Sequence, residues 1–240
     1  VLFRSGSRGI AQGSAPGLLD LVSGAALEGP RILYSPLLFA WSPDNTWLAW
    51  ASGDTVGRLP IQGEGPAWRR SPDRRYEREP IDFGGLAVSP DGMQVAASVG
   101  RGILLFDDRT GMITTLAEPP SERRFDALGF LGTDLLVASL DSQLQVLQVP
   151  SGNVVRTVDV GPMGELRVVG RSAYVLAGNA RVVRVDLDTG GVSVLLDVAC
   201  LRPEGTGQSL TALGVSGDGT TLLVGVENGA VIRLAVRGGA

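Results

Sequence analysis

Short apolar runs separated by polar turns recur along almost the whole chain. Within several runs the apolar and polar side chains alternate, as where Val183 and Val185 flank Arg184. Because successive side chains of a β-strand point to opposite faces, this alternation is typical of a half-buried strand. Turn signals return every few residues, which leaves no room for helices of ten or more residues. The pattern therefore predicts an all-β protein built from short strands.

The strands group into units of four. In the clearest unit we predict strands at 86–89, 94–98, 103–107 and 112–116, each ended by a polar turn. The strands equivalent to its third member are expected at 17–20, 144–148, 182–186 and 231–235. The chain thus repeats one supersecondary unit several times.

Two turn signals give the repeat a period. The first begins with Ser-Pro-Asp-Gly or a weakened form of it, and its aspartates are separated by 47, 43 and 84 residues. Its members are Ser42–Pro43–Asp44–Asn45, Ser89–Pro90–Asp91–Gly92, Leu131–Gly132–Thr133–Asp134 and Ser216–Gly217–Asp218–Gly219. The second is a Ser/Thr-Gly pair after an apolar strand, at Ser23–Gly24, Thr110–Gly111, Ser151–Gly152 and Thr189–Gly190. Both signals indicate a unit of about 42 residues.

Four antiparallel strands at this spacing are typical of the blades of a β-propeller. A single blade cannot bury both of its faces, so neighbouring blades must stack and share a core. A helical solenoid of similar period would need longer helices and fewer glycines than the 34 present. We expect one propeller domain over residues 17–240, preceded by an N-terminal segment at 1–16.

The turn and strand motifs resemble the WD40 and the related YVTN and TolB-type propeller repeats. The resemblance is carried by the segment 86–92, LAVSPDG, and by the pair Phe106–Asp107 at the end of a third strand. It covers residues 17–236. The chain contains no histidine, so the Gly-His pair of WD40 repeats is absent. The segment 39–52, FAWSPDNTWLAWAS, is similar to TolB-type repeats. The resemblance implies a propeller with degenerate repeats.

The number of blades leaves two alternatives open. The repeats account for about five blades, which can close into a five-bladed ring or form part of a larger ring of six to eight blades. Residues 1–5, VLFRS, match one reading frame of a common sequencing-adaptor end. We expect them to be an assembly artefact and the natural protein to extend upstream, which favours the larger ring.

Composition excludes several kinds of chemistry. The net charge is −4, and all 21 basic residues are arginine, so neither a lysine nor a histidine can serve as base, nucleophile or ligand. Cys200 is the single cysteine, which excludes an intrachain disulfide and a thiolate zinc cluster. No apolar run approaches the length of a membrane span, and no stripe of basic residues indicates nucleic-acid binding. We therefore expect no enzyme activity, cofactor, nucleic-acid partner or membrane partner.

The loops that join a fourth strand to the next first strand must emerge on one face of a propeller. Arginine and aromatic side chains concentrate in three of them, which span 60–82, 118–126 and 197–210. Such side chains dominate binding hot spots, so we predict a non-catalytic scaffold that binds a protein or peptide, acidic in character, on this face. The predicted contact residues are Trp68, Arg69, Arg70, Arg74, Arg75, Tyr76, Arg123, Arg124, Phe125 and Arg202.

A binding scaffold has three alternatives. A long loop of mixed charge can simply be solvated, and the chain could be the remnant of a propeller enzyme such as a quinoprotein, lactonase or glycosidase, or a sensor domain fused to an upstream module.

Three tryptophans, Trp41, Trp47 and Trp50, are expected to pack between blades. Asp20, Asp107 and Asp186 are expected to accept hydrogen bonds within turns.

Overall fold

The computed structural model describes residues 38–52, 55–60, 67–71, 83–119, 123–178, 180–198 and 209–236, together with the backbone of four short strands within residues 2–27. The described elements are all strands apart from turns. Among these residues there is no helix with the length and apolar character needed to cross a membrane. The predicted all-β fold is confirmed.

The strands form five four-stranded sheets, here called blades 1 to 5, and a sixth sheet of three strands. Blade 1 contains β1 (Leu2–Phe3), β2 (Arg8–Ala11), β3 (Gly17–Asp20) and β4 (Ala26–Leu27). Blade 2 contains β5 (Leu38–Trp41), β6 (Trp47–Ser52), β7 (Thr55–Pro60) and β8 (Trp68–Arg70). Blade 3 contains β9 (Phe83–Val88), β10 (Gln94–Val99), β11 (Gly102–Asp107) and β12 (Ile113–Ala117).

The remaining sheets follow the same plan. Blade 4 contains β13 (Phe125–Leu131), β14 (Leu135–Leu140), β15 (Gln143–Gln148) and β16 (Val154–Asp159). Blade 5 contains β17 (Met163–Val169), β18 (Ser172–Ala177), β19 (Arg181–Asp186) and β20 (Val192–Asp197). The three-stranded sheet contains β21 (Leu210–Val215), β22 (Thr221–Val226) and β23 (Val231–Ala235).

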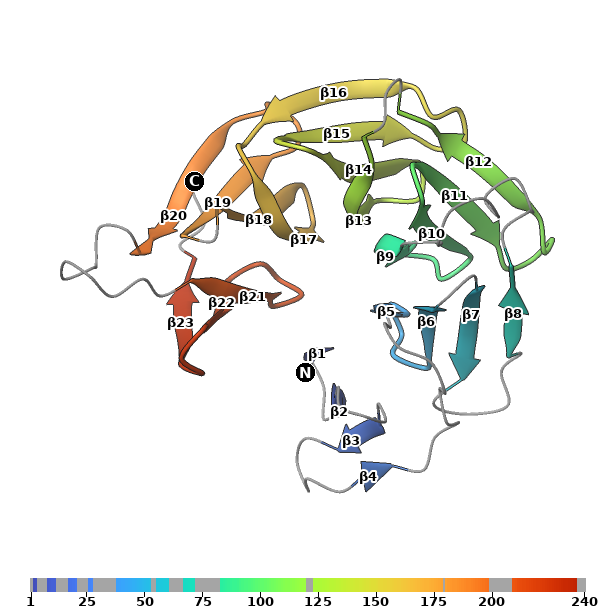
Figure 1. Cartoon of the computed structure of the whole chain (residues 1–240), viewed down its shortest axis with the longest axis horizontal. Helices are drawn as coiled ribbons and strands as arrows, with labels where there is room; N and C mark the ends of the chain where they lie inside the picture. The colour runs from blue at the N-terminus through green and yellow to red at the C-terminus, as the bar shows by residue number, and fades with distance from the viewer. Residues whose placement is uncertain are drawn as a thin grey trace.

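Each blade is a meander in which sequential strands pair antiparallel, with the first strand inside and the fourth outside (Figure 1). The sheets follow one another around a ring in chain order, which makes the protein a β-propeller (Figure 1). The predicted strands of the clearest unit fall on β9 to β12, and the predicted third strands fall on β3, β15, β19 and β23. Blade 1 also includes β1 and β2, which precede residue 17.

The Ser-Pro-Asp-Gly signal is a compact turn between the first and second strands. In blade 3, Ser89 Oγ donates to Asp91 Oδ1 at 2.5 Å and accepts from the backbone N–H of Gln94 at 2.9 Å. The fourth residue of the turn, Gly92, has a φ of +71°, in the left-handed region that glycine adopts without strain. The same pair of bonds recurs around Ser42 and Ser216. The repeated sequence signal is therefore a repeated side-chain network.

The core lies between the blades. One apolar cluster joins blades 3 and 4, another joins blades 4 and 5, and a third joins blade 5 to the three-stranded sheet. Trp47 of blade 2 is 3% exposed and packs in a cluster with Val95 and Leu104 of blade 3, which confirms that it lies between blades. Stacking of this kind buries both faces of a blade that could bury neither alone.

Candidate functional site

One position recurs just after the third strand of blades 3, 4 and 5 and of the three-stranded sheet. The backbone N–H of Asp108 donates to the carbonyl of Met93 at 2.8 Å. The residues that make the same bond in the next repeats are Val149, Leu187 and Val236, whose N–H groups donate to Asp134, Arg171 and Thr220. Val149 and Leu187 belong to the apolar clusters between blades. At this position blade 3 carries a carboxylate where its successors carry an aliphatic side chain.

The partner of this carboxylate differs in the same way. Asp108 forms an ion pair with Arg58 of β7, and both side chains are 13% exposed. Arg58 pairs with Ala49 across β6 and β7. By strand register the equivalent residues are Leu105 in blade 3, which pairs with Ala96, and Val146 in blade 4, which pairs with Val137. Leu105 lies in one cluster with Val149, and Val146 lies in one cluster with Leu187. Between blades 2 and 3 an ion pair thus replaces the apolar pair found at the next two junctions; in blade 5 the aligned residue is Arg184, opposite Tyr174.

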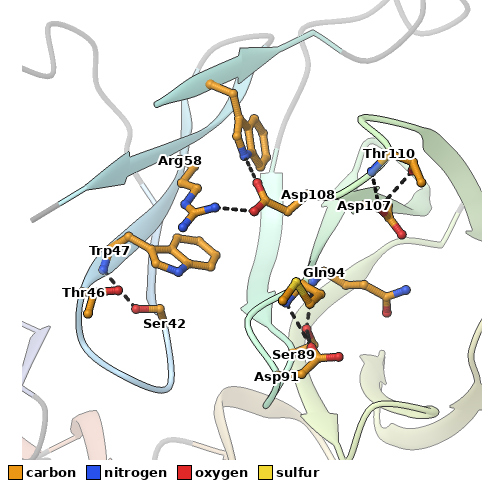
Figure 2. Close-up of polar contacts among 12 residues, drawn as sticks. Ser42, Thr46, Trp47, Arg58, Ser89, Asp91, Gln94, Asp107, Asp108 and Thr110 are labelled. Carbon is orange, nitrogen blue, oxygen red and sulfur yellow. Dashed lines mark hydrogen bonds and ion pairs between the residues drawn. The ribbon is translucent and has the colours of Figure 1, made fainter. Parts of the chain in front are cut away.

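Aromatic rings enclose the ion pair. The guanidinium of Arg58 lies over the ring of Trp47, 4.4 Å from its centroid. The indole N–H of Trp68 donates to the second carboxylate oxygen of Asp108, and its ring stacks on Phe106 with centroids 6.1 Å apart. Figure 2 shows Arg58 directed from blade 2 towards Asp108, with Trp47 beneath it. The network fixes the position of the outer strand β8 against blade 3.

A shallow depression lies beside this network at the outer edge of blades 2 and 3. It contains about 220 Å³ of empty space, part of it open to solvent. Its lining residues are Trp68, Arg70, Phe106, Asp107, Asp108, Gly111 and Met112. Met112 is 60% exposed, so its apolar side chain is accessible to a binding partner. We call the depression together with Arg69 the rim site.

The two arginines of the rim site are exposed. Arg69 lies over the ring of Trp50, 5.9 Å from its centroid, and Nη2 of Arg69 is 3.4 Å from the hydroxyl of Thr55. Arg70 makes a 3.5 Å hydrogen bond to the carbonyl of Arg69 and approaches the turn glycine Gly111. The guanidinium of Arg70 therefore retains donors that face solvent and the depression.

Asp107 is held by its own turn. Its carboxylate accepts from the backbone N–H of Thr110 at 2.7 Å and from the Thr110 hydroxyl at 2.9 Å. These hydrogen bonds hold the pKa of Asp107 below its ordinary value. Asp186 is held in the same way by Thr189 and Asp188, and its pKa is also lowered. The predicted turn role is confirmed for Asp107 and Asp186; the side chain of Asp20 lies outside the described residues.

The structure separates the predicted binding residues into two groups. Trp68, Arg69 and Arg70 form strand β8, so the prediction that they lie in a loop was wrong. Arg70 lies near Gly111, in the turn between the third and fourth strands of blade 3. Arg123 instead pairs with Asp141, in the turn between the second and third strands of blade 4, at 2.9 Å. These two turns lie at opposite ends of a blade, whereas Arg69 lies 3.4 Å from Thr55, next to the turn between the second and third strands of blade 2.

The other predicted binding residues are ion-paired, buried or outside the described ranges. Arg124 pairs with Asp126 at 3.0 Å on the same side as Arg123. Phe125 is 2% exposed and packs in the cluster between blades 3 and 4, which corrects its prediction as a contact residue. Its place at the start of an inner strand explains the burial. The remaining predicted residues lie outside the described ranges: Arg74, Arg75, Tyr76 and Arg202.

The sequence patterns did not identify Arg58 or Met112. Arg58 and Asp108 are 50 residues apart and come from different blades, so no local pattern joins them. A comparison of Asp108 with Val149 and Leu187 in the aligned repeats is the signal that could have found the site. Within the described ranges no group of three or more acidic, cysteine or histidine side chains is placed to hold a metal ion.

The fold is similar to that of solved β-propellers. The β-propeller domain of Cps50 (Swd1) from Myceliophteria thermophila aligns with a TM-score of 0.69 and 17% identity, over 98% of this chain and 89% of that chain. A chain of the mitotic checkpoint complex aligns with a TM-score of 0.67 and 14% identity, over 93% of this chain and 70% of that chain. No family model matches the sequence. No curated protein matches it either.

Proposed function

We propose that the protein is a non-catalytic, WD40-like interaction scaffold that binds an acidic protein partner at the rim site. The observation that carries the proposal is the replacement of an apolar pair by Arg58 and Asp108 between blades 2 and 3. A buried ion pair is seldom more stable than well-packed apolar residues of similar size. Its presence at one blade junction is better explained by what it positions than by stability.

The residues that it positions suit a protein partner. Trp68, Arg69 and Arg70 combine aromatic and arginine side chains, the types that contribute most to interface hot spots. Exposed guanidinium groups favour carboxylates, which they can bind through two parallel hydrogen bonds. The rigid sheet beneath them reduces the entropy lost on binding. One of the similar solved chains belongs to the mitotic checkpoint complex, which is consistent with a role in binding other proteins.

The second arginine group is a weaker candidate for the same function. Arg123 and Arg124 are each paired with an aspartate, Asp141 and Asp126. An acidic partner would have to displace these carboxylates before it could bind. Within the described part of the chain, no acidic side chain forms an ion pair with Arg70, so the rim site offers this guanidinium without such competition.

Site-specific photocrosslinking in cells of the source organism tests the proposal. Benzoylphenylalanine is introduced at Met112, in the rim site, and separately at Val154, an exposed apolar position on blade 4. We expect a protein to be crosslinked from Met112 and not from Val154. The reconstituted complex should then weaken at least about tenfold in the variant Arg69→Glu, Arg70→Glu, and it should weaken further with added salt. Crosslinks that are the same at both positions, or a complex insensitive to the charge reversal, would contradict the proposal.

A further inference from the structure

We infer that the rim site recognises an apolar side chain flanked by a carboxylate, presented by an extended acidic segment of the partner. This inference rests on the proposed function and specifies its ligand. The juxtaposition that supports it is a depression whose lining includes the apolar side chains of Trp68, Phe106 and Met112 beside the guanidinium of Arg70. One ligand residue would fill the depression while its neighbour pairs with Arg70.

The dimensions of the depression favour a single side chain. Sites for drug-sized ligands and cofactors usually enclose about 300–1,000 Å³ and bury most of the ligand. The depression has room for the centres of water-sized molecules over only about 20 Å³. It is far too small to enclose a cofactor, and it admits at most the tip of one side chain from a peptide that continues along the surface.

The charges of the site select an acidic ligand. Two carboxylates line the depression: Asp108 is paired with Arg58, and the single remaining charge of Asp107 is outnumbered by Arg69 and Arg70. Asp107 accepts two hydrogen bonds from Thr110, and Asp108 accepts from Arg58 and Trp68. The donors that remain directed towards a ligand belong to Arg70. A carboxylate on the ligand would complement that guanidinium, whereas a second cation would be repelled by it.

The walls of the depression differ in rigidity. Trp68 is fixed by its hydrogen bond to Asp108 and by stacking on Phe106. Met112 is 60% exposed, and its unbranched thioether can adapt to ligands of different shape. One fixed aromatic wall and one adaptable wall would accept leucine, isoleucine, methionine or phenylalanine. We therefore assign the site to a class of apolar anchors and not to one residue type.

Three fluorescein-labelled peptides of equal length test the inference with the whole chain. The first peptide is acidic with one central leucine between aspartates, the second has serine in place of leucine, and the third has asparagine in place of the two flanking aspartates. Fluorescence anisotropy titrations should give the leucine peptide an affinity about tenfold higher than either of the other two. The variant Arg70→Ala should remove the preference for aspartate over asparagine, and Met112→Ser should reduce the preference for leucine over serine.

The control is Arg156→Ala. Arg156 of β16 approaches Gly190 in blade 5 as Arg70 approaches Gly111 in blade 3, so it tests an arginine at an equivalent blade junction. It should leave all three affinities unchanged. Equal binding of the leucine and serine peptides, with loss of both in Arg70→Ala, would overturn the anchor while leaving the acidic-partner proposal intact. Equal binding of all three peptides, unaffected by Arg70→Ala, would overturn both.

Discussion

Arg58 and Asp108 form an ion pair between two blades at the position where the following junction joins Leu105 to Val149 through apolar packing. Both charged side chains are 13% exposed, so their desolvation has to be offset by the mutual attraction and by further contacts. Trp68 supplies one contact by donating to Asp108, and Trp47 supplies another beneath the guanidinium. Loss of either charged partner alone would leave the other desolvated without its counter-ion.

Removal of one charge of the pair should therefore lower the free energy of unfolding. The variant Asp108→Asn leaves Arg58 without its counter-ion, and we expect the free energy of unfolding to fall by about 3 kcal/mol. Urea denaturation followed by circular dichroism measures this change. The matched control is Asp188→Asn, which breaks the solvent-exposed pair of Asp188 with Arg171 and should leave stability close to that of the unaltered protein. Equal effects of the two variants would show that the inner pair has no special importance.

A turn glycine provides a test of how closely the blades pack. Gly152 has a φ of +72°, and a Cβ added there would overlap with the carbonyl oxygen of Leu116 in blade 3. Gly161 has a φ of +78° but no atom within 4 Å of an added Cβ. Gly161→Ala should cost about 1 kcal/mol through backbone strain alone. Gly152→Ala should cost about 2–3 kcal/mol more, because the blades must separate.

Thermal or urea unfolding of the two glycine variants, side by side, measures that difference. Since both substitutions impose the same left-handed strain, the difference between them isolates the contact with Leu116. If the two variants unfold at the same denaturant concentration, the outer strand of blade 3 does not pack on this turn as described.

The turn aspartates predict a dependence of stability on pH. Hydrogen bonds from Ser216 and then Thr220 lower the pKa of Asp218 from 3.8 to about 2. A carboxyl group with a lowered pKa in the folded state stabilises the fold above its unfolded pKa. That contribution is lost as the pH falls from about 4 towards 2. Asp44, Asp107 and Asp186 have lowered pKa values for the same reason and should act in the same direction.

An NMR titration of the side-chain carboxyl carbons measures these values directly. The variant Ser216→Ala removes the largest cause of the shift, so the pKa of Asp218 should rise towards 3.8. The pKa of Asp44, which depends on Ser42 in another blade, should not change in that variant. An unchanged pKa of Asp218 in the variant Ser216→Ala would contradict the turn network.

The sequence predicted the parts of the fold that depend on local patterns. The turn around Ser89 and the turn around Thr110 each place their hydrogen-bonding partners within five residues, so the spacing alone identified them. Strand β8 was not predicted because Trp68–Arg70 is short and charged and shows no alternation. Without that strand, its arginines were assigned to a loop.

The rim site depends on contacts that no local pattern contains. Asp108 meets Arg58 and Trp68 across a blade junction, at sequence separations of 50 and 40 residues. Phe125 follows two exposed arginines in the sequence, but it begins an inner strand and is buried. Only the stacking of the blades distinguishes these neighbours, because it decides which residues face another sheet and which face solvent.

The most direct test of the ion pair's role is the double variant Arg58→Val, Asp108→Leu, which gives this junction the apolar pair found at Val146 and Leu187. Its free energy of unfolding and its affinity for the leucine-containing acidic peptide are measured together. We expect stability equal to or above that of the unaltered protein, with affinity reduced about tenfold because Trp68 is no longer held. A double variant that loses stability as Asp108→Asn does, yet binds the peptide unchanged, would mean that the ion pair serves the fold and not the site.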